Sequence, residues 1–183
     1  MIVRKCNTQA EIEAALKVRR TVFVVEQKID PALEFDGRDK DAAHVAAFDG
    51  DKVVGAARIL PHDGNAEIGR LAVLPEYRGR GIGGAIMREA ECVARMMGLR
   101  VAVIHAQSHA VDLYKKLRYT ISSAEFTEAG IPHVEMRKEL PPASKVICKV
   151  CGAENAFLSD RDREVVCAKC GYRIVGHELW RVV

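Results

Sequence analysis

The pattern of apolar and polar residues over the first 73 positions predicts several strands and one early helix. Four stretches have the length and the apolar content of strands: Ile2–Cys6, His44–Phe48, Val53–Ile59 and Asn65–Val73. Asp49-Gly50, between the second and third stretches, is typical of a tight hairpin turn. Thr8 and Glu11 have the spacing of a capping box, so we expect a helix to begin at Thr8. The acidic stretch from Glu26 to Asp41 contains Pro31 and Gly37, and it is expected to be a loop with a short helical turn.

The pattern from residue 75 to residue 138 predicts two further helices and three further strands. A turn over Pro75–Gly79 leads into a long helix that opens at Gly81 and ends at Gly98. Its apolar stripe consists of Ile82, Ile86, Ala90, Val93, Ala94 and Met97. Ser108 is expected to cap the next helix. The three strands are Arg100–His105, Tyr119–Ser122 and His133–Lys138.

These elements predict an α+β fold with a mixed, mainly antiparallel sheet flanked by helices. The strand–helix–strand segment from Asn65 to His105 should form its one parallel crossover. Leu140-Pro141-Pro142-Ala143-Ser144 has the composition of a linker. We therefore expect a main domain over residues 1–140, a linker over residues 141–145 and a small second unit over residues 146–183.

The composition narrows the class of protein. The chain of 183 residues is 49% hydrophobic and 29% charged, as is usual for a soluble globular protein, and its net charge of +3 is too small to indicate a polyanionic partner. Residues 1–20 hold no apolar segment like that of a signal peptide, and no apolar run approaches membrane-spanning length. We therefore expect a cytoplasmic protein with no membrane partner. Its oligomeric state does not follow from the sequence.

A glycine-rich turn is the first candidate for chemistry. Arg78-Gly79-Arg80-Gly81-Ile82-Gly83-Gly84 follows a predicted strand and opens a predicted helix. The first N–H groups of a helix have no backbone partner, and glycines let an anion approach, so this turn predicts a phosphate site. The glycine spacing also fits a dinucleotide fingerprint, but the next strand carries no acid for a ribose, and the turn lies behind three antiparallel strands. A Walker loop is excluded because no Gly-Lys-Ser/Thr follows.

The same segment carries a resemblance to a known family. Together with Leu71–Tyr77 before it, the turn resembles the motif Arg/Gln-x-x-Gly-x-Gly/Ala of the GNAT N-acetyltransferases, with Arg78, Gly81 and Gly83 at the defining positions. The resemblance covers about residues 2–140. Strings similar to the ElaA-like branch of that family are Arg20–Gln27, Glu34-x-Asp36, His44, His105-Ala106-Gln107 and Ala129–His133.

The resemblance implies acetyl-CoA as the cosubstrate. It implies that the backbone N–H groups of Arg78 to Gly84 hold the coenzyme pyrophosphate, and that Leu71, Ala72 and Val73 pair with the pantetheine arm like an added strand. Gln107 stands where the family more often has asparagine, and we expect it to contact the coenzyme. Tyr114 lies in a segment similar to the helix that carries the family's general acid, so we expect it to touch the coenzyme and protonate its thiolate. The alternative is that Tyr114 only packs in the core.

The base that frees the amine is less clearly indicated. An amine with a pKa near ~10.4 is mostly protonated at neutral pH, so a base or a path to water is needed. Glu67, His105 and Glu26 are the candidate side chains, and a chain of water molecules to bulk solvent is a fourth. For each side chain the alternative is an ordinary solvated carboxylate or a hydrogen-bonded core histidine.

Acidic residues before the second predicted strand suggest how the acceptor binds. Glu26, Glu34 and Asp36, with Asp39 and Asp41 beside them, gather near one edge of the predicted cleft. They would suit a cationic amine on a small molecule or a protein. The alternative is a charged surface loop.

Four cysteines near the C-terminus predict a metal site. Cys148-x-x-Cys151 and Cys167-x-x-Cys170 are separated by fifteen residues, and a glycine follows each pair. This is the spacing of a four-thiolate structural Zn²⁺ site, with a redox dithiol as the alternative. We expect Phe157-Leu158 and Val165-Val166 to form a hairpin between the pairs. The segment resembles the zinc ribbon of transcription factor IIB, which implies docking on a protein or nucleic acid.

Two functions compete at this point. The first is an N-acetyltransferase that moves an acetyl group from acetyl-CoA to a primary amine. The second is a non-catalytic acetyl-CoA-binding adaptor whose ribbon docks on a transcription-related protein or nucleic acid. The glycine-rich turn and Tyr114 favour the first function, and the ribbon keeps the second open.

Overall fold

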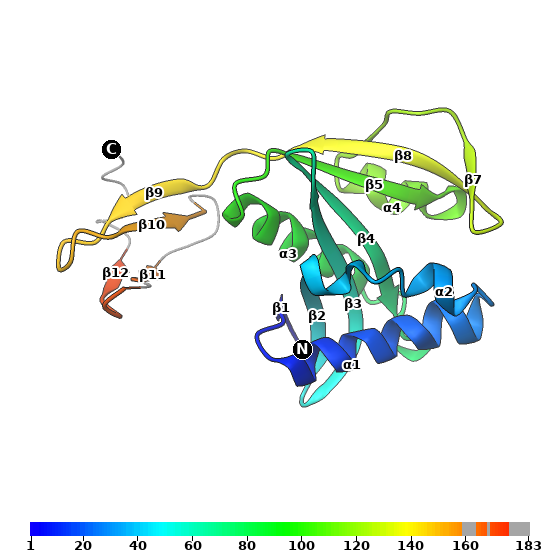
Figure 1. The fold of residues 1–183 in the computed structure, drawn as a ribbon, viewed down its shortest axis with the longest axis horizontal. Helices are drawn as coiled ribbons and strands as arrows, with labels where there is room; N and C mark the ends of the chain where they lie inside the picture. The colour runs from blue at the N-terminus through cyan, green and yellow to red at the C-terminus, as the bar shows by residue number, and fades with distance from the viewer. Residues whose placement is uncertain (159–163, 168, 176–183) are drawn as a thin grey trace.

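The computed structural model describes residues 1–158, 164–167 and 169–175. Its main part is an eight-stranded sheet in the order β1-β2-β3-β4-β5-β8-β6, with β7 paired to β8 (Figure 1). The strands are β1 (Ile2–Lys5), β2 (Ala43–Asp49), β3 (Lys52–His62), β4 (Asn65–Val73), β5 (Val101–Gln107), β6 (Thr120–Ile121), β7 (Phe126–Glu128) and β8 (Ile131–Glu139). Among the described pairs of this sheet, β4 and β5 are parallel and the others antiparallel. The predicted α+β fold and its crossover are confirmed.

Helices cover both faces of the sheet. They are α1 (Gln9–Arg19), α2 (Pro31–Glu34), α3 (Ile82–Met96) and α4 (Val111–Lys116). Successive residues of β2 enter two different cores: Val45 and Ala47 belong to the core that contains α3, whereas Ala46 and Phe48 belong to the core that contains α1. Burial on both faces explains why this strand is continuously apolar in the sequence.

The first helix begins as predicted and ends differently. The Thr8 side chain accepts a hydrogen bond from the Glu11 N–H, and the Glu11 carboxylate accepts one from the Thr8 N–H, so the capping box is confirmed. Beyond α1 the chain continues as a π-helical segment over Arg20–Glu26, which the sequence did not predict. This segment places Glu26 and Gln27 at the edge of the cavity described below.

Two local predictions have different outcomes. The short helical turn expected in the acidic stretch is present as α2, which Asp30 caps by accepting from the Ala32 N–H, and a 3₁₀ turn over Arg38–Asp41 follows it. Ser108 does not cap α4; its hydroxyl donates to Glu125 Oε2 at 2.7 Å, and a 3₁₀ turn precedes the helix. Among the described residues, no helix combines the length and apolar character needed to cross a membrane.

The two central strands separate because a bulge bends β4. Their parallel register joins Ala66 to Ala102 and Glu67 to Val103. Farther along β4, its register with β3 shifts opposite Arg70. Arg70 has a φ of 56°, in the left-handed region that costs a residue with a side chain about 1 kcal/mol. The bulge therefore leaves a gap between the ends of β4 and β5.

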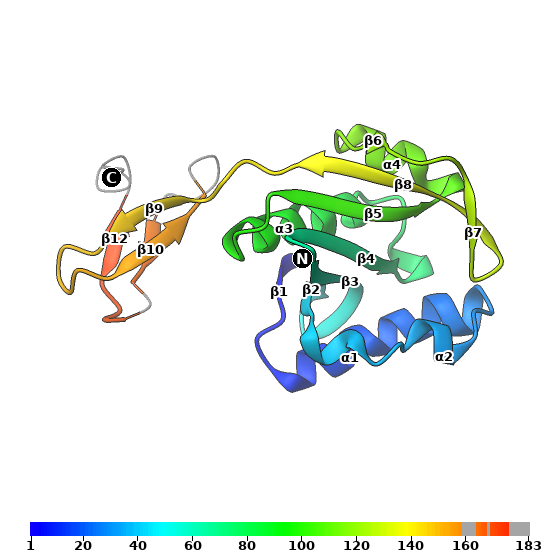
Figure 2. The same ribbon diagram turned by 45° about the horizontal axis from the view of Figure 1, so that its top comes forward.

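The C-terminal unit consists of two small hairpins. β9 (Ser144–Ile147) pairs with β10 (Glu154–Phe157), and β11 (Glu164–Val166) pairs with β12 (Arg173–Val175). The predicted hairpin of Phe157-Leu158 with Val165-Val166 is therefore wrong, because each strand pairs across its own Cys-x-x-Cys turn. β9 begins inside the segment expected to be a linker. The unit lies beside the large sheet (Figure 2), and residues 176–183 of the predicted unit lie outside the described residues.

Candidate active site and metal site

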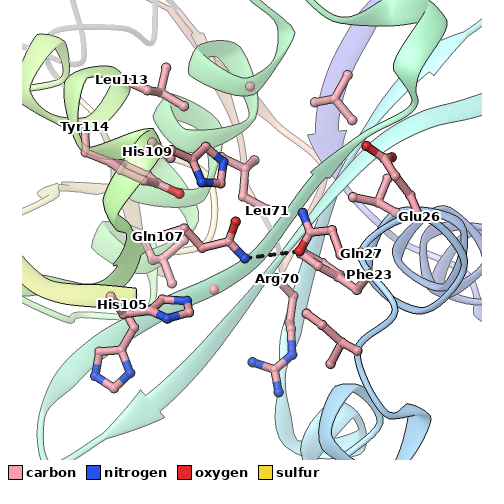
Figure 3. Close-up of a pocket in the computed structure, with 18 of the residues that line it drawn as sticks. Phe23, Glu26, Gln27, Arg70, Leu71, His105, Gln107, His109, Leu113 and Tyr114 are labelled. Atoms are coloured by element: carbon pink, nitrogen blue, oxygen red, sulfur yellow. Dashed lines mark hydrogen bonds between the residues drawn. The ribbon is translucent and has the colours of Figure 1, made fainter. Parts of the chain in front are cut away.

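A cavity of about 720 Å³ opens where β4 and β5 separate. Its walls come from β4, β5, the glycine-rich turn, α4 and the π-helical segment, and Figure 3 shows the side chains that face it. Phe23, Ile29 and Leu33 supply part of its apolar surface. A cavity of this size and mixed character is large enough for a coenzyme arm and a small acceptor.

The N-terminus of α3 forms one end of the cavity. Gly81 is the N-cap with a φ of 75°, and no side chain caps the helix. The first backbone bond of the helix runs from the Ala85 N–H to the Gly81 carbonyl at 3.1 Å, so the N–H groups of Ile82, Gly83 and Gly84 have no partner within the helix. A Cβ built on Gly79 or Gly81 meets no atom within 4 Å, so the space above the turn is open. These features fit an anion such as a diphosphate.

The two arginines of the turn are already paired. Arg78 donates to both carboxylate oxygens of Glu26 at 2.7 and 2.6 Å and to the Val73 carbonyl at 2.9 Å. This ion pair lowers the pKa of Glu26. Arg80 donates to the Glu76 carbonyl at 2.9 Å. The ion pair therefore links the π-helical segment to the turn, and the charge of Arg78 is neutralised by Glu26.

The three β4 residues predicted to contact the coenzyme, Leu71, Ala72 and Val73, do not all face the cavity. Leu71 and Val73 line the cavity, together with Ile82 from the start of α3. Ala72 is 2% exposed and packs into the core that contains α1. Its side chain therefore faces away from the cavity, and only its backbone is available for the predicted contact.

Two glutamines link the end of β5 to the end of the π-helical segment. Gln107 Nε2, at the end of β5, donates to Gln27 Oε1, just after the π-helical segment, at 3.1 Å. Figure 3 shows this bond running across the cavity. Gln107 thus occupies the wall where the coenzyme contact was predicted, and Gln27 is a neighbour that the sequence did not suggest.

Tyr114 lies in the wall opposite Glu26 and points its hydroxyl toward the cavity (Figure 3). Its residue is 8% exposed, and this burial raises the pKa of the phenol to about 12. The edge of Tyr119 packs against its ring at a centroid distance of 6.0 Å. The phenol therefore stays protonated at neutral pH and faces the cavity as a donor.

His105 and Glu67 lie at the other end of the cavity. The His105 side chain is 45% exposed, and its Nδ1 lies 2.9 Å from Glu128 Oε2 on β7. The hydrogen bond with Glu128 raises the pKa of His105. Glu67 forms a loose ion pair with Arg38 Nη1 at 3.4 Å. Glu128 was missed by the sequence analysis because it lies 23 residues from His105 and belongs to no motif.

The acids expected to bind the substrate are paired with arginines. Glu34 is 2% exposed, and its carboxylate lies 2.6 Å from Arg19 Nε and 2.9 Å from Arg70 Nε. Asp36 receives two bonds from Arg58 at 2.7 and 2.8 Å, and this pairing holds the pKa of its carboxyl well below the usual range. Glu34 lines the cavity, whereas Asp36 lies behind it. The cluster is therefore a neutralised network rather than an open negative patch.

The four C-terminal cysteines converge. Their Sγ atoms all lie within 4.8 Å of one another, although they come from two separate turns. In each turn a glycine N–H donates to the first cysteine's carbonyl at 2.8 Å, and Gly152 and Gly171 have φ values of 69° and 72°. Backbone N–H groups after Cys167 lower the pKa of its thiol to about 6. Four thiols that converge from two turns fit a tetrahedral metal site.

Known proteins resemble this chain over the part that contains the cavity. A family model described as "Acetyltransferase (GNAT) domain" matches residues 8–140. The Bacillus subtilis (strain 168) protein YyaT is 39% identical over 145 residues, which cover 76% of this chain and 97% of YyaT. The cysteine cluster lies beyond the residues that the family model matches.

Solved structures agree with the sequence comparison. An acyl-CoA N-acyltransferase from Pseudomonas aeruginosa is 30% identical with a TM-score of 0.68, over 75% of this chain and 99% of that one. Escherichia coli ElaA is 25% identical with a TM-score of 0.68, over 76% of this chain and 100% of ElaA. The shared region is the whole of these shorter proteins.

Proposed function

Because the chain belongs to the GNAT family of acyl-CoA N-acyltransferases, we propose that it moves an acetyl group from acetyl-CoA to a primary amine of a small molecule or a protein. The observation that carries the proposal is the uncapped N-terminus of α3, which opens onto a cavity of about 720 Å³. A helix N-terminus with unpaired N–H groups is suited to a diphosphate. The same cavity holds a buried, protonated phenol and an exposed imidazole.

We assign the coenzyme to the half of the cavity next to the turn. The diphosphate takes the N–H groups of residues 78–84, with Gly79 and Gly81 leaving it room. The bulged end of β4 offers the backbone of Leu71–Val73 to the pantetheine arm, and Gln107 offers its amide from β5. Arg78 contributes its N–H here rather than its guanidinium, because Glu26 holds the guanidinium.

We assign the general-acid role to Tyr114. When the amine attacks the thioester carbonyl, the leaving thiolate needs a proton, and a phenol that stays protonated above pH 10 is able to supply it. Burial raises the pKa of Tyr114 to about 12, so the phenol is in its protonated, donor form at neutral pH. The hydroxyl faces the cavity between Gln107 and the start of α3 (Figure 3).

We place the acceptor amine at the end of the cavity lined by Glu67, His105 and Glu128. Carboxylates there attract an ammonium group, and the imidazole is able to take its proton. Glu34 and Asp36 are reassigned to holding α2 and the bulge in place, because arginines neutralise them. Glu26 is excluded as the general base because Arg78 neutralises its carboxylate.

A direct assay tests this function. The protein is incubated with acetyl-CoA and a panel of diamines, amino sugars and lysine-containing peptides, while free thiol release and the mass of each amine are followed. We expect at least one amine to gain an acetyl group with one thiol released per transfer. Coenzyme binding without acetylation of any amine would instead favour the non-catalytic adaptor.

We also propose that residues 146–183 form a separate unit held by one structural Zn²⁺. Cys148, Cys151, Cys167 and Cys170 are its ligands, and a closed set of four thiolates leaves no position for catalysis. The core around them is small, consisting mainly of Val146, Phe157 and Ile174. A unit of this size depends on its metal to fold. Docking of this unit on a protein or nucleic acid remains a prediction from its resemblance to a zinc ribbon.

A further inference from the structure

Two residues of one strand, β7, hold the His105 ring, although this strand is not adjacent to His105 in the sequence. β7 places Glu128 Oε2 at 2.9 Å from His105 Nδ1 and turns the edge of the Phe126 ring onto the imidazole at a centroid distance of 5.1 Å. The turn after β7 is fixed by two left-handed residues, Ala129 with a φ of 50° and Gly130 with a φ of 77°. An exposed histidine on a strand would otherwise rotate freely.

The contact with Glu128 decides which ring nitrogen faces the substrate. A carboxylate only accepts hydrogen bonds, so Nδ1 carries the proton in this contact. The neutral ring then keeps its lone pair on Nε2. The hydrogen bond with His105 in turn lowers the pKa of Glu128, which stays ionised at neutral pH. The pair therefore presents a proton acceptor of one defined tautomer at the acceptor end of the cavity.

Other charged groups around His105 are less able to take this role. Glu67 on β4 and Glu135 on β8 face it and help to raise the pKa of its ring. Glu135 is engaged by Arg137 Nε at 2.8 Å and by the Ser122 hydroxyl at 2.8 Å. His133, also on β8, donates from Nδ1 to the Ile131 carbonyl at 2.8 Å. Glu128 is thus the one charged group among the described residues that is hydrogen-bonded to the ring.

We propose that Glu128 is the positioning residue that holds His105 as the general base, through its bond to Nδ1. The inference rests on the proposed acetyltransferase function. The ammonium group gives one proton to His105 Nε2, which passes it to solvent. The nitrogen then bonds to the thioester carbon as the carbon–sulfur bond breaks. Tyr114 protonates the thiolate and regains a proton from the nitrogen as the amide forms.

The first test needs no substrate. Histidine-selective ¹⁵N NMR of the full-length protein, assigned with a His105→Asn variant, reports the tautomer and the pKa of His105. We expect the Nδ1–H tautomer in the wild type, with a pKa above the usual 6.5. Glu128→Gln keeps an acceptor but loses the charge, so the pKa should fall while the tautomer stays. Glu128→Ala removes both, so the Nε2–H tautomer should appear.

Glu135→Gln is the matched control, because it removes a carboxylate facing the same ring without removing a bond to it. We expect its effect on the pKa of His105 to be the smaller of the two. Equal shifts in the Glu128→Gln and Glu135→Gln variants, or an unchanged tautomer in Glu128→Ala, would overturn the proposed contact.

The second test follows the rate. In Glu128→Gln the rising limb of kcat/KM against pH should move to lower pH, with kcat reduced by about 10- to 100-fold and the KM for acetyl-CoA unchanged. The reaction uses the amine found in the assay above, or water as the acceptor if none is acetylated. An active wild type with an unmoved limb in Glu128→Gln would refute this inference alone. A wild type that neither binds acetyl-CoA nor releases thiol would refute the proposed function instead.

Discussion

Tyr114 and Tyr119 differ in whether the hydroxyl reaches the cavity, and this difference decides which of them is a candidate general acid. Both residues are tyrosines buried side by side, and their rings meet edge to face. Of the two, only Tyr114 lines the cavity, whereas the buried Tyr119 hydroxyl has no hydrogen-bond partner within the described part of the chain. The segment around Tyr114 resembles the family's general-acid helix, but only the structure shows which hydroxyl reaches the cavity. A matched pair of variants therefore tests the general acid.

We predict that Tyr114→Phe lowers kcat by roughly 10²-fold, because the thiolate loses its proton donor. The affinity for acetyl-CoA should hardly change, since the ring remains. Tyr119→Phe, which removes an equally buried hydroxyl outside the cavity, should keep its kcat. Steady-state rates with the acetylated amine and calorimetry with acetyl-CoA provide the measurements. If both variants keep wild-type turnover, Tyr114 is a packing residue.

The candidate site was predictable where one short motif carries the chemistry. The glycine-rich turn and the four cysteines lie in contiguous strings, and the structure places each string as a compact group. Glu128, Gln27 and the pairing of Glu26 with Arg78 depend on contacts between residues far apart in the chain. Such contacts follow from strand order and from the bulge in β4, which no single stretch of sequence encodes.

At the scale of elements, a network of ion pairs holds the acceptor side of the cavity. Arg19 from α1, Arg58 from β3 and Arg70 from the bulge bind Glu34 and Asp36, which follow one another in and after α2. Arg70 also donates to the Leu33 carbonyl at 3.0 Å. These bonds supply a reason why a residue with a side chain tolerates the left-handed conformation at the bulge. The network therefore fixes the point where β4 and β5 separate.

We predict that Asp36→Asn lowers the free energy of unfolding by about 2–3 kcal/mol at pH 7, because the buried Arg58 loses its two short bonds to a carboxylate and keeps, among the described residues, only the longer ion pair with Asp39 at 3.5 Å. The folded pKa of Asp36 is depressed, so its contribution is present above the unfolded pKa near ~3.9 and is lost as the pH falls below it. The difference between the variant and the wild type should shrink from about pH 5 downward.

Urea unfolding at several pH values measures this difference. Asp63→Asn is the control, because Asp63 is exposed in a hairpin turn, where asparagine tolerates the same positive φ. A destabilisation by Asp36→Asn that is the same at pH 3 and at pH 7 would contradict the role of its charge.

The success of element prediction depended on local signals. The Thr8–Glu11 capping box was confirmed because each side chain accepts a hydrogen bond from the other residue's backbone N–H within one turn. The predicted helix cap at Ser108 was wrong because the Ser108 hydroxyl donates to Glu125, which is distant in the sequence. The ribbon hairpin was wrong because apolar pairs alone do not reveal that strands meet across the cysteine turns. Competing long-range partners account for both errors.

At the scale of the whole molecule, the contact between the C-terminal hairpins and the main sheet that the described residues show lies away from the glycine-rich turn. Leu158 lines a small pocket of about 410 Å³ with Met96 and Met97 at the C-terminal end of α3. The turn lies at the other end of this 15-residue helix, about 22 Å away at 1.5 Å per residue. A change in the cysteine unit should therefore leave the turn undisturbed.

We predict one zinc per chain in protein purified under reducing conditions without chelators. Mild chelation should unfold the cysteine unit and leave acetyl-CoA binding intact, because the main core does not include the metal. Cys170→Ser should lose the metal, whereas Cys92→Ser, outside the cluster, should keep it. Metal analysis and circular dichroism follow these changes. Loss of coenzyme binding on chelation would show that the unit braces the main domain.

Calorimetric titration of acetyl-CoA into the wild type, Gly81→Asp and Gly64→Asp tests directly whether the glycine-rich turn binds the coenzyme. Both glycines have positive φ values and open space around their Cβ positions, so the two variants carry similar backbone strain. Only Gly81 caps α3 at the cavity. We predict micromolar binding by the wild type and Gly64→Asp, and no detectable binding by Gly81→Asp, because a carboxylate would occupy the place of the diphosphate. Unchanged affinity for acetyl-CoA in Gly81→Asp would show that the diphosphate does not bind at the N-terminus of α3.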